Sequence, residues 1–197
     1  MNYIKKLYKL IFLVVLGTVL TGCPPPCDYM LIDYGALSLE AIACSPYQDG
    51  QSYSFLHSGG QKISFLANRT REIRTEYYDE CTELRAESDL SVLSPDYPIF
   101  SCNVGISKTD STRYHCLIWV GESSFWLPFT IEIDIGHIYF DSLQIGQSWY
   151  REVYKIGNNW REELPEQQIL ADSIYYNTSK GILKILMSNG EFYEIHN

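Results

Sequence analysis

The stretch DSIYYNTSKGILKILMSNGEFYEI, residues 172–195, decides the fold class of this chain. Two turn signals, Thr-Ser-Lys-Gly at 178–181 and Asn-Gly at 189–190, separate three runs rich in isoleucine, leucine and tyrosine. Asn-Gly between apolar runs is a strong hairpin signal, because both central residues of a type I′ turn need positive φ. The stretch therefore predicts three antiparallel strands joined as a meander.

The Asn-Gly turn also predicts a register for the last two strands. A two-residue loop places Leu186 opposite Tyr193 and Ile185 opposite Glu194. Both faces of the ribbon then carry apolar side chains, so we expect the ribbon to be covered by the rest of the protein.

The same pattern of short apolar runs and turn residues extends through most of the chain and is typical of an antiparallel β protein. The expected strands cover residues 52–57, 61–67, 71–78, 99–107, 114–120, 126–133, 137–143, 149–156, 173–177, 182–187 and 191–195. Residues 79–90 also fit a helix, and residues 28–42 are ambiguous. We expect an all-β fold over residues 31–197 as a single domain, an antiparallel meander forming a sandwich or a partly open, lipocalin-like barrel.

The N-terminal segment has the three parts of a secretory signal. Lys5, Lys6 and Lys9 provide a basic start, an apolar run extends from 10 to 20, and small residues precede Cys23. The apolar run is too short to span a hydrocarbon core of about 30 Å. Residues 1–22 are therefore predicted to be a signal peptide.

The four residues Leu20-Thr21-Gly22-Cys23 resemble the lipobox of bacterial lipoproteins. This resemblance implies that Cys23 is acylated and becomes the first residue of the mature chain, followed by a proline-rich tether over residues 23–30. An ordinary cleaved signal peptide, with Cys23 as a bystander, is the alternative. Lipidation at Cys23 would make the membrane the first partner of this protein, since more than one acyl chain gives stable attachment.

Residues 174–195, together with Gly-Gln-Ser-Trp-Tyr at 146–150, are similar to the C-terminal regions of uncharacterised Bacteroidota-type lipoproteins. Such families have no established activity, so the resemblance implies a location and a fold rather than a reaction. Some members carry acidic residues directly after the lipidated cysteine as a surface-export signal, whereas Pro24-Pro25-Pro26 follows here. The resemblance thus implies lipid anchoring to the outer membrane, facing the periplasm.

Charge excludes one class of partner. The whole chain carries −9, and removal of residues 1–22 takes away three lysines and no acid, which gives −12. A domain this acidic is not expected to bind nucleic acid.

The chain has six cysteines. With Cys23 acylated, five cysteines remain, and an odd number cannot all form disulfides within the chain. Cys27, in the tether, is our candidate for the unpaired cysteine. The disulfide candidates are then Cys44, Cys81, Cys102 and Cys116, with three connectivities open.

The sequence predicts no catalytic, metal or cofactor site. The four histidines, His57, His115, His137 and His196, show no metal-ligand spacing. His115 beside Cys116 fits a thiol nucleophile, but we expect Cys116 in a disulfide. Glu132 and Asp134 share one face of an expected strand, as paired glycosidase carboxylates would.

Aromatic side chains are concentrated in two parts of the sequence, and two roles are open for them. They pack a β core or line a pocket for a small hydrophobic or glycan ligand. The residues concerned are Trp119, Phe125, Trp126, Phe129, Trp149, Tyr150, Tyr154 and Trp160. We expect core packing, and a non-catalytic binding or structural module of the cell envelope; a glycan-acting hydrolase of the periplasm is the alternative function.

Overall fold

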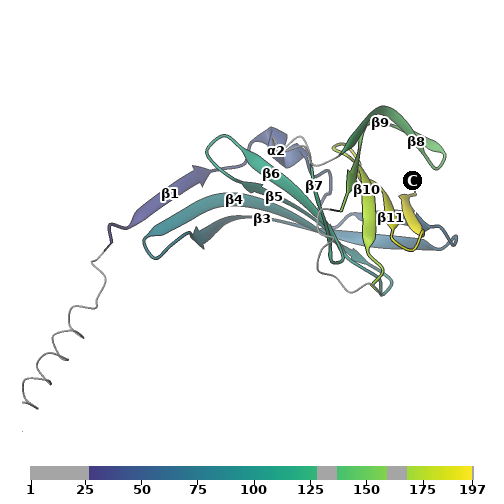
Figure 1. Ribbon diagram of the computed structural model, residues 1–197, viewed down its shortest axis with the longest axis horizontal. Coiled ribbons are helices and arrows are strands. Elements are labelled where there is room, and N and C mark those ends of the chain that lie inside the picture. Colours follow the sequence, from purple (N-terminus) through teal and green to yellow (C-terminus); the bar gives the residue numbers. More distant parts are fainter. Residues whose placement is uncertain (1–26, 128–136, 159–167, 197) are drawn as a thin grey trace, which may run out of the picture.

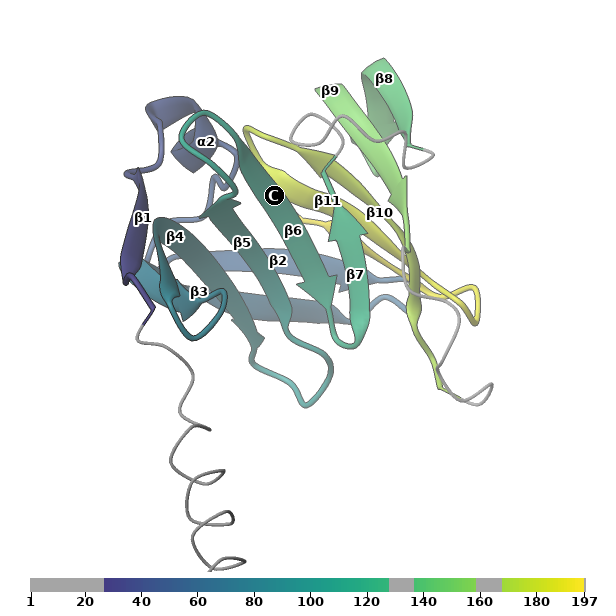
Figure 2. The same ribbon diagram turned by 60° about the vertical axis from the view of Figure 1, so that its left-hand side comes forward.

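The computed structural model describes residues 27–127, 137–158 and 168–196, and these form one sheet that curls into a partly open barrel (Figures 1 and 2). This confirms the predicted all-β class. The elements are β1 (Met30–Gly35), α2 (Leu39–Ala43), β2 (Ser52–His57), β3 (Lys62–Tyr77), β4 (Thr82–Pro95), β5 (Cys102–Lys108), β6 (Tyr114–Val120), β7 (Ser123–Trp126), β8 (Ile138–Ile145), β9 (Ser148–Gly157), β10 (Ala171–Asn177), β11 (Gly181–Met187) and β12 (Phe192–Ile195).

The strand order is β7-β6-β5-β4-β3-β2-β12-β11-β10-β9-β8, so most neighbours in the sheet are also neighbours in the chain. Pairing of β12 with β2 joins the first and last parts of this meander. Strand β1 is different, because it runs parallel to β4. It occupies the part of the β4 edge that β5 leaves open, since β5 pairs with 88–93 and β1 with 82–86.

The curl brings β7 close to β10 and β9 at the open side of the barrel. The side-chain oxygen of Ser123 accepts the backbone N–H of Ala171 at 3.0 Å. Asn158, directly after β9, accepts the N–H of Ser124 through its side-chain oxygen at 3.4 Å. Side-chain hydrogen bonds thus connect β7 to β10 and to the end of β9. A complete barrel would be closed here by backbone hydrogen bonds between strands.

Several predicted strands are confirmed and some boundaries are corrected. Strands β2 and β6 have the predicted bounds. The expected strands 61–67 and 71–78 are one continuous strand, β3. The ambiguous residues 28–42 divide into β1 and α2, whose first turn is capped by the Ser38 hydroxyl accepting the Ala41 N–H at 3.1 Å. Most of the expected strand 126–133 lies outside the described residues.

The alternative of a helix over residues 79–90 is wrong. A turn follows β3, and β4 then runs from Thr82 to Pro95. This segment contains good helix formers, but it pairs with β3 over its whole length and with β1 and β5 on its other edge. Pairing on both edges outweighs the weak intrinsic preference for helix.

The predicted register of the last hairpin is also wrong, by one residue. Ile185 pairs with Tyr193, and Lys184 with Glu194. The loop has three residues, 188–190, because the N–H of Met187 donates to the Glu191 carbonyl at 2.9 Å. Gly190 has φ of +88°, but Asn189 is not among the residues with positive φ, so this is a three-residue turn with a glycine bulge rather than type I′. The observed register places apolar Ile185 beside Tyr193 and joins Lys184 to Glu194 at 3.3 Å.

The inside of the barrel is packed with side chains. The largest buried ones include Tyr47, Tyr176, Phe55, Phe65 and Phe125, each no more than 1% exposed. A smaller cluster lies beside β8 and consists of Ile145, Tyr150, Val153 and Leu183. Among the residues that the structure describes, the inward-facing side chains thus pack against one another as a protein core.

The segment from α2 to Tyr47 closes one end of the barrel and is held by hydrogen bonds to the far strands (Figure 2). The Tyr47 hydroxyl accepts the Ile182 N–H at 2.7 Å. The Tyr176 hydroxyl donates to the Cys44 carbonyl. Burial raises the pKa of both tyrosines, so both hydroxyls are protonated at neutral pH.

Candidate functional site

A groove of about 330 Å³ lies on the sheet where β1 meets β4 and β5, and we refer to it as the outer groove. Inward-facing residues of β5 and β6, such as Ile106 and Cys116, are buried in the core. Their neighbours Ser107 and His115 therefore point to the outer face of the barrel. The groove is lined by Tyr34, Arg74, Glu76, Leu84, Ala86, Glu87, Ser88, Ser107, Lys108, Thr109 and His115.

Three polar residues of the outer groove form a row across neighbouring strands. Ser88 of β4 pairs with Ser107 of β5, and Ser107 pairs with His115 of β6. No hydrogen bond joins His115 to either serine among the residues that the structure describes. The row presents hydroxyl and imidazole groups to a ligand, but it is not a nucleophile and base in contact.

His115 is held against Trp126, with an edge-to-face contact of 5.3 Å between ring centroids. Burial lowers the pKa of His115, while the nearby Glu76 carboxylate opposes this effect. The imidazole is therefore neutral at pH 7 and offers one donor and one acceptor.

The charged groups at the end of the groove are engaged within the protein. The Lys108 ammonium donates to the carbonyl of Tyr34 at 2.8 Å and to that of Ser111 at 3.0 Å, which fixes the end of β1. Glu87 accepts two hydrogen bonds from Arg71, at 2.7 and 3.0 Å, and these hold the pKa of its carboxyl below the ordinary value. Arg74, which pairs with Glu72 at 2.9 Å, and the Glu76 carboxylate also line the groove, so a ligand meets charged groups as well as hydroxyl and imidazole groups.

The most buried ion pair among the described residues lies inside the barrel, not in the groove. Asp89 is 1% exposed and forms a 2.7 Å ion pair with Arg69. The Arg69 guanidinium also donates to three backbone carbonyls of the closing segment, those of Ile42, Ser45 and Tyr47. The pair is satisfied on every side and fastens the α2 segment to β3 and β4.

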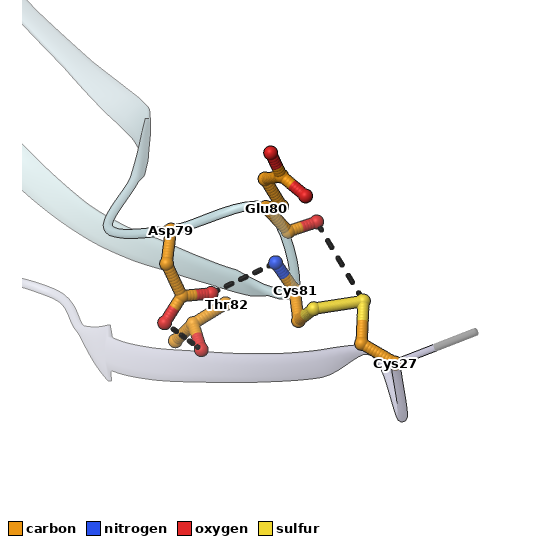
Figure 3. The surroundings of a disulfide bond; sticks show 5 residues. All are labelled: Cys27, Asp79, Glu80, Cys81 and Thr82. Atoms are coloured by element: carbon orange, nitrogen blue, oxygen red, sulfur yellow. Dashed lines mark hydrogen bonds between the residues drawn. A yellow bond between two sulfur atoms is a disulfide. The ribbon is translucent and has the colours of Figure 1, made fainter. Parts of the chain in front are cut away.

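The cysteines pair differently from our prediction. Cys27 forms a disulfide with Cys81, with 5.7 Å between their Cα atoms (Figure 3). Cys27 is thus not the cysteine left over, and the tether expected over residues 23–30 is joined to the domain at Cys27. The Asp79 carboxylate accepts the Cys81 N–H at 2.8 Å and the Thr82 hydroxyl at 3.1 Å, which shapes the turn that presents Cys81.

The other three disulfide candidates, Cys44, Cys102 and Cys116, are buried thiols. Cys102 and Cys116 face inward on β5 and β6, whereas Cys81 lies at the far end of the β3–β4 hairpin. Burial raises the pKa of all three thiols, so they are protonated and poor nucleophiles at neutral pH. A thiol nucleophile at Cys116 has no support from this environment.

The remaining candidates do not come together. The His57 ring makes a tilted contact with Tyr193, with 4.8 Å between ring centroids, and the His137 ring lies 6.1 Å from that of Tyr154, while His115 lies in the outer groove. Among the described residues, no three His, Cys, Asp or Glu side chains are placed to hold a metal ion. Glu132 and Asp134 lie outside the described residues, as do Phe129 and Trp160.

The aromatic residues are divided between core and surface. Phe125 is in the main core and Tyr150 in the smaller cluster, whereas Trp149 is 69% exposed. The described members of this set form no single platform for a ligand. The outer groove was missed by the sequence analysis, because its residues come from β1, β3, β4, β5 and β6 and meet only through the strand order.

In the described part of the chain, no helix has the length and apolar character needed to cross a bilayer. The chain matches no protein-family model, no curated protein and no solved structure.

Proposed function

We propose that this chain is a lipid-anchored protein of the cell envelope and acts as a non-catalytic binding module. In this proposal residues 1–22 are removed, Cys23 is acylated, and the domain faces the periplasm from the outer membrane. The observation that carries the proposal is Leu20-Thr21-Gly22-Cys23 at the end of an apolar run with a basic start. The Cys27–Cys81 disulfide supports it, since disulfides persist in oxidising compartments.

The binding role rests on the outer groove. Its volume is near the lower end of the range of ligand sites, about 300–1,000 Å³. Its lining combines hydroxyl groups and the rings of Tyr34 and His115 with the charged side chains of Arg74 and Glu76, which suits a polar ligand of the glycan class. The described inward-facing side chains are buried in the core, so the outer groove rather than the interior carries this proposal.

Mass spectrometry of the native protein tests the anchor. We expect a mature chain that begins at Cys23 and carries a diacylglyceryl group and an N-terminal acyl chain. The Cys23→Ser variant is the control, because it keeps the same apolar run and loses the acceptor sulfur. A native chain that still begins at Met1, or that has an unmodified Cys23 sulfur, would contradict the anchor.

Titration with soluble muropeptides, followed by calorimetry, tests the binding role. Ser107→Leu fills the outer groove, and Ser94→Leu makes the same change at an exposed position of β4 outside it. We expect Ser107→Leu to weaken binding at least about tenfold, through loss of a hydrogen bond and a steric block, and Ser94→Leu to leave it unchanged. Equal binding by both variants would exclude the groove, and no binding by the wild-type chain would leave only a structural role.

A further inference from the structure

One end of the molecule carries a group of exposed apolar side chains, and we call it the apolar tip: Tyr29, Met30, Leu31, Tyr77 and Tyr78. Each is at least 47% exposed, and Tyr77 and Tyr78 are 75% and 77% exposed. They come from the start of β1 and the residue before it, and from the end of β3 and the turn that follows. These segments lie side by side at the end of the molecule opposite the C-terminus (Figure 1).

The pairing of the strands brings these apolar residues together around Glu83. Leu31 pairs with Glu83, which in turn pairs with Tyr77, so the two apolar residues lie in one row on one face. Met30 pairs with Thr82, and the Thr82 carbonyl accepts the N–H of Tyr78 at 2.9 Å. Because neighbouring residues of a strand point to opposite faces, apolar groups lie on both sides of the tip.

The Cys27–Cys81 disulfide fixes the beginning of the chain to this same tip. Only three prolines separate Cys27 from Cys23. Four residues span at most about 14 Å when fully extended. An acyl group on Cys23 therefore enters the bilayer within about that distance of the apolar tip.

We propose that the apolar tip rests in the interfacial region of the membrane beside the lipid anchor, so that the domain stands upright on it; this inference rests on the proposed acylation of Cys23. Tyrosine is the side chain that favours this region, because its ring lies among acyl chains while its hydroxyl reaches water. The partner is a lipid surface and not a second protein, since the anchor already holds the tip against it.

The charges around the tip specify the kind of lipid. Four acidic residues, Asp28, Asp79, Glu80 and Glu83, lie in the same two segments as the apolar residues. Glu83 accepts a hydrogen bond from the Tyr29 hydroxyl, which keeps that ring over the strand. Like charges repel an anionic surface, so the tip fits zwitterionic headgroups.

The test uses full-length acylated protein in phosphatidylethanolamine–phosphatidylcholine vesicles whose acyl chains are brominated near the headgroup. Tyr78→Trp places an indole at the tip, and the matched control Tyr97→Trp places one in the loop at the other end of β4. Wild-type protein gives the background of the four native tryptophans. We expect bromine to quench the added fluorescence at position 78 by about twofold or more and to leave that at position 97 unchanged.

Three results would overturn the inference. Equal quenching by bromine at positions 78 and 97, in a protein whose acyl groups are confirmed by mass spectrometry, would refute the tip contact and leave the anchor intact. Absence of the acyl groups would remove the proposed function and this inference together. Stronger quenching when half of the lipid is replaced by phosphatidylglycerol would refute the preference for zwitterionic headgroups.

Discussion

Loss of the Cys27–Cys81 disulfide should lower the free energy of unfolding by about 4 kcal/mol. The bridge closes a loop of 54 residues. In the loop-entropy treatment this removes about 14 cal/mol/K from the unfolded chain, or about 4 kcal/mol at 25 °C. The double variant Cys27→Ser/Cys81→Ser and the wild type should show this difference in urea unfolding followed by circular dichroism.

Reductant provides the control for this measurement. It should destabilise the wild type by the same amount and leave the double variant unchanged, because Cys44, Cys102 and Cys116 are thiols in the structure. A double variant that is further destabilised by reductant would show that another pair of cysteines is bridged. A loss below about 1 kcal/mol in the double variant would refute the loop-entropy reasoning.

The bridge also has a local consequence. It joins the segment before β1 to the β3–β4 turn, and within the described ranges β1 pairs with the edge of β4 alone. Amide hydrogen exchange of Met30–Gly35 should therefore accelerate in the double variant well before that of β10 and β11. Equal acceleration in both regions would mean that the disulfide acts on the whole barrel at once.

The sequence is sufficient for the class of fold because alternation and turn residues are local signals. Strands β2 and β6 have the bounds that these signals predict. The register of the last hairpin is not local in this sense. Asn189 is compatible with two turn geometries, and the choice depends on which faces of β11 and β12 the core covers, so Ile185 pairs with Tyr193 and not with Glu194.

The cysteine pairing and the outer groove depend on contacts between segments far apart in the chain. Assigning Cys27 to the tether separates it from Cys81, whereas the parallel pairing of β1 with β4 brings the two together. Parallel pairing of this kind gives no signal in either strand alone. The groove likewise joins Tyr34 of β1 to His115 of β6, and only the strand order makes them neighbours.

Two further predictions concern the closed end of the barrel. Gly181→Ala should destabilise more than Gly190→Ala in thermal unfolding: both glycines have positive φ, which costs alanine about 1–2 kcal/mol, but only at 181 does the added methyl meet the Tyr47 ring. Equal losses would show that Tyr47 moves aside freely. Arg69→Met should cost about 3–5 kcal/mol in urea unfolding, because it leaves the Asp89 carboxylate buried without its cation. Adding Asp89→Leu removes that charge, so the double variant should be more stable than Arg69→Met alone. Recovery should be partial, since three backbone carbonyls still lose their donor. A double variant less stable than Arg69→Met would mean that the Asp89 carboxylate contributes to stability without Arg69, contrary to the cost expected for a buried carboxylate without its cation.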